Sequence, residues 1–161
     1  MHRSENAIYR LLAISTSTDL LNLSILEPAV ETLFGAVMGS RSGLVGVEGG
    51  ALFLDLGGGS VQMTWVDTSK PNYEIDAARA GVSLPFGAAR LIRVLHEQPA
   101  DVRATEISKL KVGMRQAYAN LCSQFPALEA IRASHAKGSR VNVYMCGGGF
   151  RGYGSMLMHE D

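Results

Sequence analysis

The pattern of hydrophobic and polar positions predicts a chain that mixes strands with helices. The apolar runs 51–56 and 61–66 each have the length and composition of a strand, and a short turn separates them. Alternation over 21–26 predicts an earlier strand, and the apolar run 141–146 predicts a later one. We also expect a strand over 73–84, with a bend at Gly81. The strands 51–56, 61–66 and 73–84 would then form a meander.

Apolar residues at helical spacing predict helices between and around these strands. A proline at position 28 suits the first turn of a helix over about 29–39. The longest amphipathic pattern covers 101–122, and shorter ones cover 6–13, 87–96 and 127–136. A last helix is expected to begin around 150–154. These helices would cover the sheet, which makes the chain an α/β protein.

Composition and charge limit the classes of function. Nearly half of the 161 residues are hydrophobic, so one domain of this length can bury a core, and the 15 basic and 15 acidic residues balance. A net charge of zero gives no field that would attract nucleic acid or an anionic membrane. The apolar runs are well short of the roughly 20 residues that a membrane span needs. We therefore expect a cytoplasmic protein that binds neither nucleic acid nor membrane.

The strongest candidate for chemistry is the segment Asp55-Leu56-Gly57-Gly58-Gly59-Ser60, which follows a buried strand. Glycine permits positive φ and a close approach of the backbone to a ligand, so these amides could form a phosphate-binding nest, to which Ser60 adds a hydroxyl donor. Asp55 could hold a divalent cation that bridges to phosphate. A flexible hairpin turn without a ligand is the alternative interpretation.

A second glycine cluster also follows an apolar strand. Gly147, Gly148 and Gly149 come directly after 141–146 and precede the last predicted helix. A strand, a glycine turn and a helix in this order can bring a helix N-terminus against a phosphate or a nucleotide. We therefore predict that this turn contributes to the same kind of site.

Three segments carry a resemblance to a known family. FLDLGGGSVQMTW, SLPFGAARL and MCGGGF resemble motifs of the exopolyphosphatase and guanosine pentaphosphate phosphohydrolase family, within the actin and hexokinase superfamily. Among its members, VETLFGAVMGSRS and CGGGFRGYGSM look most similar to the fungal retrograde regulation proteins, which signal the state of mitochondria to the nucleus. The resemblance covers roughly residues 20–161.

This resemblance implies an actin-like (ribonuclease H-like) ATPase-type fold. Its mixed sheet would contain three meander strands and a later strand, with flanking helices. Residues 1–39 would be a fragment of a first actin-like domain with its linking helix. Residues 40–161 would be a second, phosphate-binding domain that is incomplete at its C-terminus, so we expect a truncated copy.

The resemblance also implies a ligand and a reaction. The ligand would be ATP, GTP or polyphosphate, and any reaction would be phosphoanhydride hydrolysis with Mg²⁺ at Asp55, phosphate on residues 57–60 and Glu31 as the catalytic base. A solvated helix glutamate is the alternative for Glu31. Two departures argue for weak or absent turnover: Gln62 stands where catalytic members have an acid, and nothing in residues 1–20 matches the first phosphate motif.

The sequence therefore leaves enzymatic activity open. The leading expectation is a phosphate- or nucleotide-binding domain of a retrograde signalling regulator. The alternatives are a non-catalytic interaction module, acting through a protein partner or as a homodimer, and a degenerate gene fragment.

Overall fold

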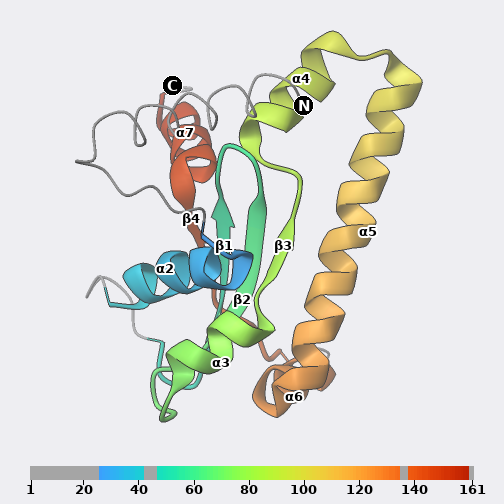
Figure 1. The fold of residues 1–161 in the computed structure, drawn as a ribbon. Coiled ribbons are helices and arrows are strands. Elements are labelled where there is room, and N and C mark those ends of the chain that lie inside the picture. Colours follow the sequence, from blue (N-terminus) through green and yellow to red (C-terminus); the bar gives the residue numbers. More distant parts are fainter. Residues whose placement is uncertain (1–25, 42–46, 135–137, 160–161) are drawn as a thin grey trace, which may run out of the picture.

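The computed structural model describes residues 26–41, 47–134 and 138–159. The helix predicted over 6–13 and nearly all of the strand predicted over 21–26 lie outside these ranges. The described residues form six helices and a four-stranded sheet (Figure 1). In chain order they are α2 (Pro28–Ser40), β1 (Ala51–Leu56), β2 (Val61–Val66), α3 (Tyr73–Ala80), β3 (Val82–Leu84), α4 (Ala88–Glu97), α5 (Ala100–Gln124), α6 (Pro126–Ala133), β4 (Val143–Cys146) and α7 (Gly147–Met158).

The sheet has the order β3-β2-β1-β4. Strands β1, β2 and β3 pair antiparallel in succession, and β4 pairs parallel with β1 on its other side. The α/β class, the three-strand meander and the later strand predicted from the sequence are thus confirmed. The strands predicted over 51–56 and 61–66 have the bounds observed for β1 and β2.

The strand predicted over 73–84 is wrong for its first eight residues. Residues 73–80 form helix α3, and only Val82–Leu84 pair with β2. The segment contains three alanines, which favour a helix, and its charges suit the helix dipole, with Glu74 and Asp76 in the first turn and Arg79 in the last. The predicted meander is still formed, because α3 is inserted between β2 and β3 and β3 still pairs with β2.

The two faces of the sheet are covered by different helices. On one face, α5 and α6 cover an apolar cluster whose largest fully buried members are Trp65, Leu121 and Leu128. On the other, α2 and α3 cover a smaller cluster built around Phe53 and Val66. Burial of each large apolar side chain contributes about 1.5–3 kcal/mol, so the two clusters fix which face each helix covers.

Helix α2 crosses one face of the sheet (Figure 1). Gly35 of α2 lies against Asp55 on β1, and Gly39, one turn later, lies against the ring of Phe53. Added Cβ atoms would come within 2.6 Å of the Asp55 Oδ2 and the Phe53 Cε1 atoms, so both glycines let the helix approach the sheet closely. Among the described residues, none of the helices combines the length and the apolar composition needed to cross a bilayer.

Candidate phosphate-binding site

The glycine turn at residues 57–60 connects β1 to β2. The Gly57 N–H donates to the Ser60 carbonyl oxygen at 3.0 Å, which closes the hairpin. The turn does not use the positive φ that glycine permits, because the positive-φ glycines among the described residues are Gly49, Gly50, Gly138 and Gly147. Gly58 and Gly59 are exposed, and a Cβ atom added at either would meet nothing within 4 Å. The turn therefore leaves open space beside its backbone.

The N-terminus of α4 orients this turn. The Ala88 N–H donates to the Gly57 carbonyl oxygen at 2.9 Å, and the Ala89 N–H donates to the Gly58 carbonyl oxygen at 3.0 Å. In a trans peptide the C=O and the following N–H point in opposite directions. The N–H groups of Gly58 and Gly59 therefore both point away from α4, and neither has a protein acceptor among the described residues.

Gly87 and Arg90 hold α4 in this position. A Cβ atom at Gly87 would collide with the backbone of Gly58 and Gly59, so only glycine permits this approach. The Arg90 guanidinium donates to the Pro85 carbonyl oxygen at 2.8 Å and to Glu106 Oε2 on α5 at 2.7 Å. These contacts tie the start of α4 to the long helix and fix the direction in which the turn's amides point.

A row of polar and sulfur-bearing side chains crosses the sheet next to the turn. Asp55 on β1 is in register with Gln62 on β2 and Cys146 on β4, and Gln62 is in register with Ser83 on β3. Residues in register share one face of a sheet, which here is the face covered by α2. Gln62, only 3% exposed, donates from Nε2 to Ser60 Oγ at 2.7 Å. The Ser60 O–H is thereby left to donate to a ligand.

The Asp55 carboxylate lies where three elements meet. Gly35 of α2 faces one carboxylate oxygen, and Gly147 at the end of β4 faces the other. Burial raises the pKa of the neighbouring Cys146 thiol, and the negative charge of Asp55 raises it further. The absence of side chains at Gly35 and Gly147 is therefore what makes room for this carboxylate between helix and sheet.

The second glycine cluster forms the first turn of α7, which begins earlier than predicted. Gly147 has φ +86°, and a Cβ atom there would collide with Asp55 Oδ1 and lie 2.5 Å from the Leu56 carbonyl oxygen. A Cβ atom at Gly149 would lie 2.5 Å from the Leu56 side chain, whereas one at Gly148 would meet nothing within 4 Å. Gly147 and Gly149 thus allow α7 to begin against the end of β1.

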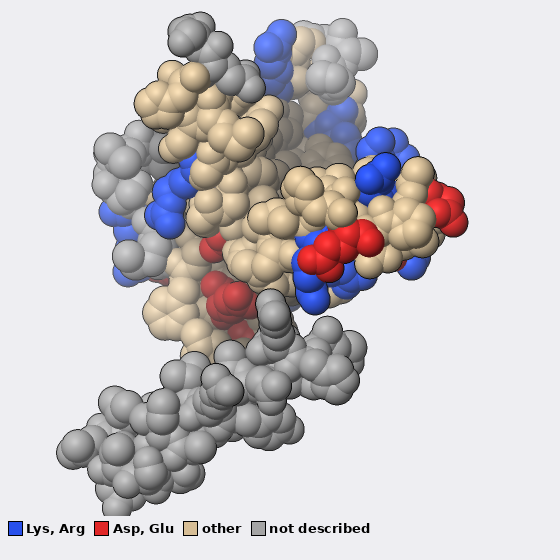
Figure 2. Space-filling model, turned by 90° about the horizontal axis from the view of Figure 1, so that it is seen from above, with Lys and Arg blue, Asp and Glu red and all other residues tan. Residues whose placement is uncertain are grey.

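The predicted site residues lie mostly at one end of the sheet. Asp55, the turn 57–60 and the start of α7 are adjacent there, and α4 and α7 stand on either side of the turn (Figure 1). In Figure 2, which looks down on this end, the charged side chains lie mainly towards the edge around an uncharged middle. Glu31 is exposed in the first turn of α2, one helical turn before Gly35, and therefore on the side of the helix that faces Asp55.

The residues that could hold a metal are few. Within the described part of the chain no group of three or more His, Cys, Asp or Glu residues could enclose an ion. Of the described carboxylates, Asp55 lies at the end of β1 beside the turn. Mg²⁺ is commonly bound by one or two carboxylates while keeping water and phosphate oxygens as its other ligands, so a single carboxylate fits this ion better than it fits zinc.

The sequence did not reveal the structural roles of two contributors to this site. Gly87 and the first amides of α4 set the orientation of the turn, and Gln62 supports Ser60. A signal existed for a third, Gly35, because glycine inside a helix costs up to about 1 kcal/mol relative to alanine and commonly marks a close approach. The partner of that approach, Asp55, is not visible in the sequence.

Comparison with known proteins gives one distant match. The chain is 26% identical over 167 residues to retrograde regulation protein 2 of Saccharomyces cerevisiae. This chain is a distant homologue of that protein. The alignment covers 94% of this chain and 26% of the yeast protein, so the chain spans about a quarter of its relative's length. No family model matches the chain, and no solved structure matches it.

Proposed function

We propose that this chain is a phosphate- or nucleotide-binding domain of the actin-like, exopolyphosphatase-related type, acting in a retrograde signalling regulator. The ligand is ATP, GTP or polyphosphate. The similarity to the yeast retrograde regulation protein and the mixed sheet with its meander and parallel β4 support this assignment.

One observation carries the proposal. The amides of Gly58 and Gly59 are exposed, point the same way and have no protein acceptor in the described residues. Consecutive N–H groups of this kind form an anion-binding concavity, and phosphate oxygens are strong acceptors. The Ser60 hydroxyl, held by Gln62, adds a donor beside them. A phosphate is therefore the ligand whose chemistry best matches the turn.

Hydrolysis is a further part of the proposal. A magnesium ion bound to Asp55 would neutralise charge on the phosphate oxygens. Glu31 would accept the proton of the attacking water, and the turn amides would hold the phosphate in place. Because Gln62 can neither ionise nor accept that proton as a base, we expect turnover to be slow or absent even when phosphate binds.

Thermal unfolding tests the binding. A ligand that binds only the folded chain raises its melting temperature, by an amount equivalent to about 2.7 kcal/mol when the ligand is at 100 times its dissociation constant. We expect ATP, GTP or short polyphosphate, each with magnesium, to raise the melting temperature. Gly58→Val, which fills the open space beside the amides, should abolish the rise, and Asp55→Asn should weaken it.

A matched control separates lost binding from a disturbed fold. Gly152 on α7 also has no neighbour within 4 Å of an added Cβ atom, so Gly152→Val makes the same chemical change away from the turn. This variant should keep the full rise. If none of the phosphate ligands shifts the melting temperature of a cooperatively folding chain, the phosphate-binding proposal is wrong.

A second candidate function is a protein-interaction module. It is favoured by a set of exposed apolar side chains on β4, an edge strand of the described sheet, and on α7: Met145, Tyr153, Met156, Leu157 and Met158. Exposed patches of this kind commonly mark interfaces. Sedimentation of the wild-type chain and of Met156→Glu tests this candidate, because a dimer through α7 should dissociate in the variant.

A further inference from the structure

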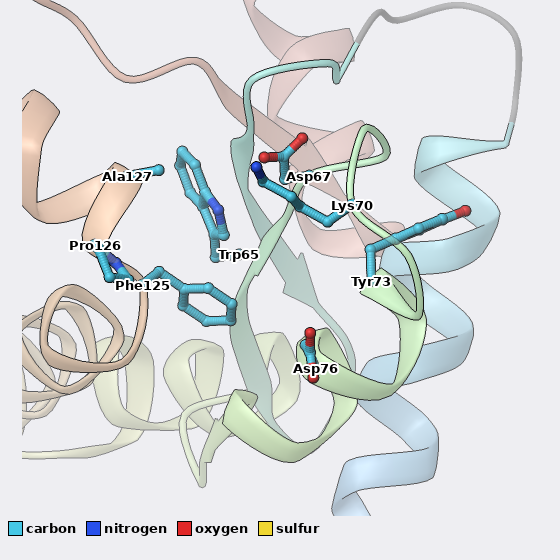
Figure 3. Close-up of a pocket in the computed structure, with 8 residues that line it drawn as sticks. All are labelled: Trp65, Asp67, Lys70, Tyr73, Asp76, Phe125, Pro126 and Ala127. Carbon is cyan, nitrogen blue, oxygen red and sulfur yellow. The ribbon is translucent and has the colours of Figure 1, made fainter.

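A pocket of about 300 Å³ lies at the end of β2 opposite to the glycine turn. Its apolar wall is formed by Trp65 of β2 and by Phe125, between α5 and α6 (Figure 3). The two ring centroids are 6.5 Å apart, and the ring planes are tilted by 43°. The two rings therefore form an aromatic corner. The pocket volume is at the lower limit for ligand pockets, so the pocket suits a small molecule.

The indole N–H of Trp65 is a donor that no group in the described part of the chain uses. Trp65 is only 2% exposed, yet its Nε1 has no hydrogen-bond acceptor in the part of the chain that the structure describes. No side-chain nitrogen or oxygen there is both unpaired and sealed from solvent, so this atom keeps some contact with solvent. Figure 3 places the nitrogen-bearing edge of the indole toward the middle of the pocket. Water can accept this hydrogen bond in the free protein, so a ligand that fills the pocket would have to supply an acceptor in its place.

Two charged side chains at the rim form no ion pair in the described part of the chain. They are Lys70, from the loop after β2, and Asp76, on α3, and both line the pocket. Asp67 differs, because its Oδ1 already accepts hydrogen bonds from the Gly49 N–H and from the N–H and the hydroxyl of Ser69. Burial alone would raise the pKa of Asp67, but these hydrogen bonds, together with the positive charge of Lys70, outweigh it and lower the pKa. Asp67 is therefore part of the wall.

These features together describe the ligand. A hydrogen-bond acceptor is needed at Trp65, a negative group suits Lys70, a positive group suits Asp76, and an apolar body fits the aromatic corner. We propose that the pocket binds a small zwitterion with an apolar side chain, of the class and size of an aliphatic α-amino acid. Its carboxylate meets the Trp65 N–H and Lys70, its ammonium group meets Asp76, and its side chain lies on Trp65 and Phe125. This site is separate from the glycine turn and does not depend on phosphate binding.

Tryptophan fluorescence tests the proposal directly, because Trp65 is the single tryptophan of the chain. The probes are L-leucine, L-leucinamide, which lacks the carboxylate, and 4-methylpentanoate, which lacks the ammonium group. We expect leucine to change the emission saturably, with a dissociation constant of about 1 mM or lower. Each of the other two should bind at least about tenfold more weakly, because one charged contact is lost.

Paired variants identify the two charged contacts. Asp76→Asn should lower the affinity for leucine to that for 4-methylpentanoate, and it should leave the affinity for 4-methylpentanoate itself unchanged. Lys70→Met should lower the affinity for leucine to that for leucinamide, and it should leave the affinity for leucinamide unchanged. The controls are Asp101→Asn and Lys111→Met, which remove the same charges at exposed positions on α5 and should leave every affinity unchanged.

Three results would overturn the proposal. The first is the absence of any saturable change up to about 10 mM leucine in a chain that melts cooperatively. The second is an equal response to all three probes, which would indicate an apolar site without recognition of charge. The third is a loss of affinity in the α5 controls equal to the loss in the pocket variants, which would indicate a nonspecific effect of net charge.

Discussion

The two glycine triplets have the same sequence but meet different structural demands. In the second triplet, Gly147 needs positive φ, and both Gly147 and Gly149 lie so close to β1 that an added Cβ atom would collide with it. In the first triplet, Gly58 and Gly59 have neither a positive φ nor a neighbour within 4 Å of an added Cβ atom. Packing thus explains Gly147 and Gly149 at the start of α7, whereas it leaves Gly148 and the glycines of the β1–β2 turn unexplained.

The difference separates a structural role from a functional one. Glycines that packing requires would occur at the start of α7 whether or not a ligand binds. Glycines that packing does not require leave the backbone accessible, which is useful where a ligand must reach N–H groups. The comparison therefore assigns Gly147 and Gly149 to the fold and leaves the first triplet, together with Gly148, as the candidates for ligand contact, and substitutions at both triplets can test this division.

The largest effect is expected for Gly147→Ala. A methyl group there would be strained by the positive φ and would collide with Asp55 and with the Leu56 carbonyl. We expect the free energy of unfolding to fall by about 3 kcal/mol or more, measured by urea denaturation. Gly148→Ala is the control, because position 148 is open and alanine favours a helix. Similar losses in both variants would remove the distinction within the triplet.

A smaller loss is expected for Gly149→Ala. The added methyl group meets mainly the Leu56 side chain, which can move, so we expect a cost of about 1–2 kcal/mol in urea denaturation. Leu56→Ala removes the obstructing atoms, and the double variant should therefore lose less stability than the sum of the two single variants. If the stability losses of the two single variants simply add in the double variant, the Leu56 side chain is not the cause of the loss in Gly149→Ala.

The sequence was sufficient to predict those strands and helices whose bounds are set by neighbouring residues along the chain. Strands β1 and β2 were predicted with their observed bounds, since each is a short apolar run that ends at glycine or at a polar turn. The strand predicted over 73–84 failed over residues 73–80, which form α3. The helix propensity of the alanines and the placement of charges at the two ends of α3 favour the helix there.

The site was predictable only where its parts adjoin along the chain. Asp55 and the turn 57–60 are neighbours in sequence, so their association follows from the hairpin. The approach of Gly147 to Asp55 depends on the parallel pairing of β4 with β1, and the direction of the turn's amides depends on α4. The pocket at Trp65 was missed altogether, because its walls come from segments about 60 residues apart in the sequence.

The contact between the two turns can be measured at Cys146, the N-cap residue of α7. Burial is the main cause of its raised pKa, and the Asp55 charge is the second cause. Asp55→Asn removes only the second, so the pKa should fall, and the thiolate fraction at pH 8 should rise. We expect alkylation of Cys146 to be about two- to fivefold faster. Cys146→Ser corrects for Cys122, and Asp76→Asn, a distant loss of charge, should leave the rate unchanged.

The smallest effect on stability is expected for Gly58→Ala, and it is the sharpest test of the comparison. The added methyl group meets no neighbour, and the backbone there does not need positive φ, so the free energy of unfolding should change by no more than about 0.5 kcal/mol in urea denaturation. If the same variant also binds polyphosphate more weakly, glycine at this position serves binding and not folding. A loss of about 1 kcal/mol or more would instead place Gly58 with Gly147 as a structural glycine, and the main argument for a phosphate site at the turn would then lose its support.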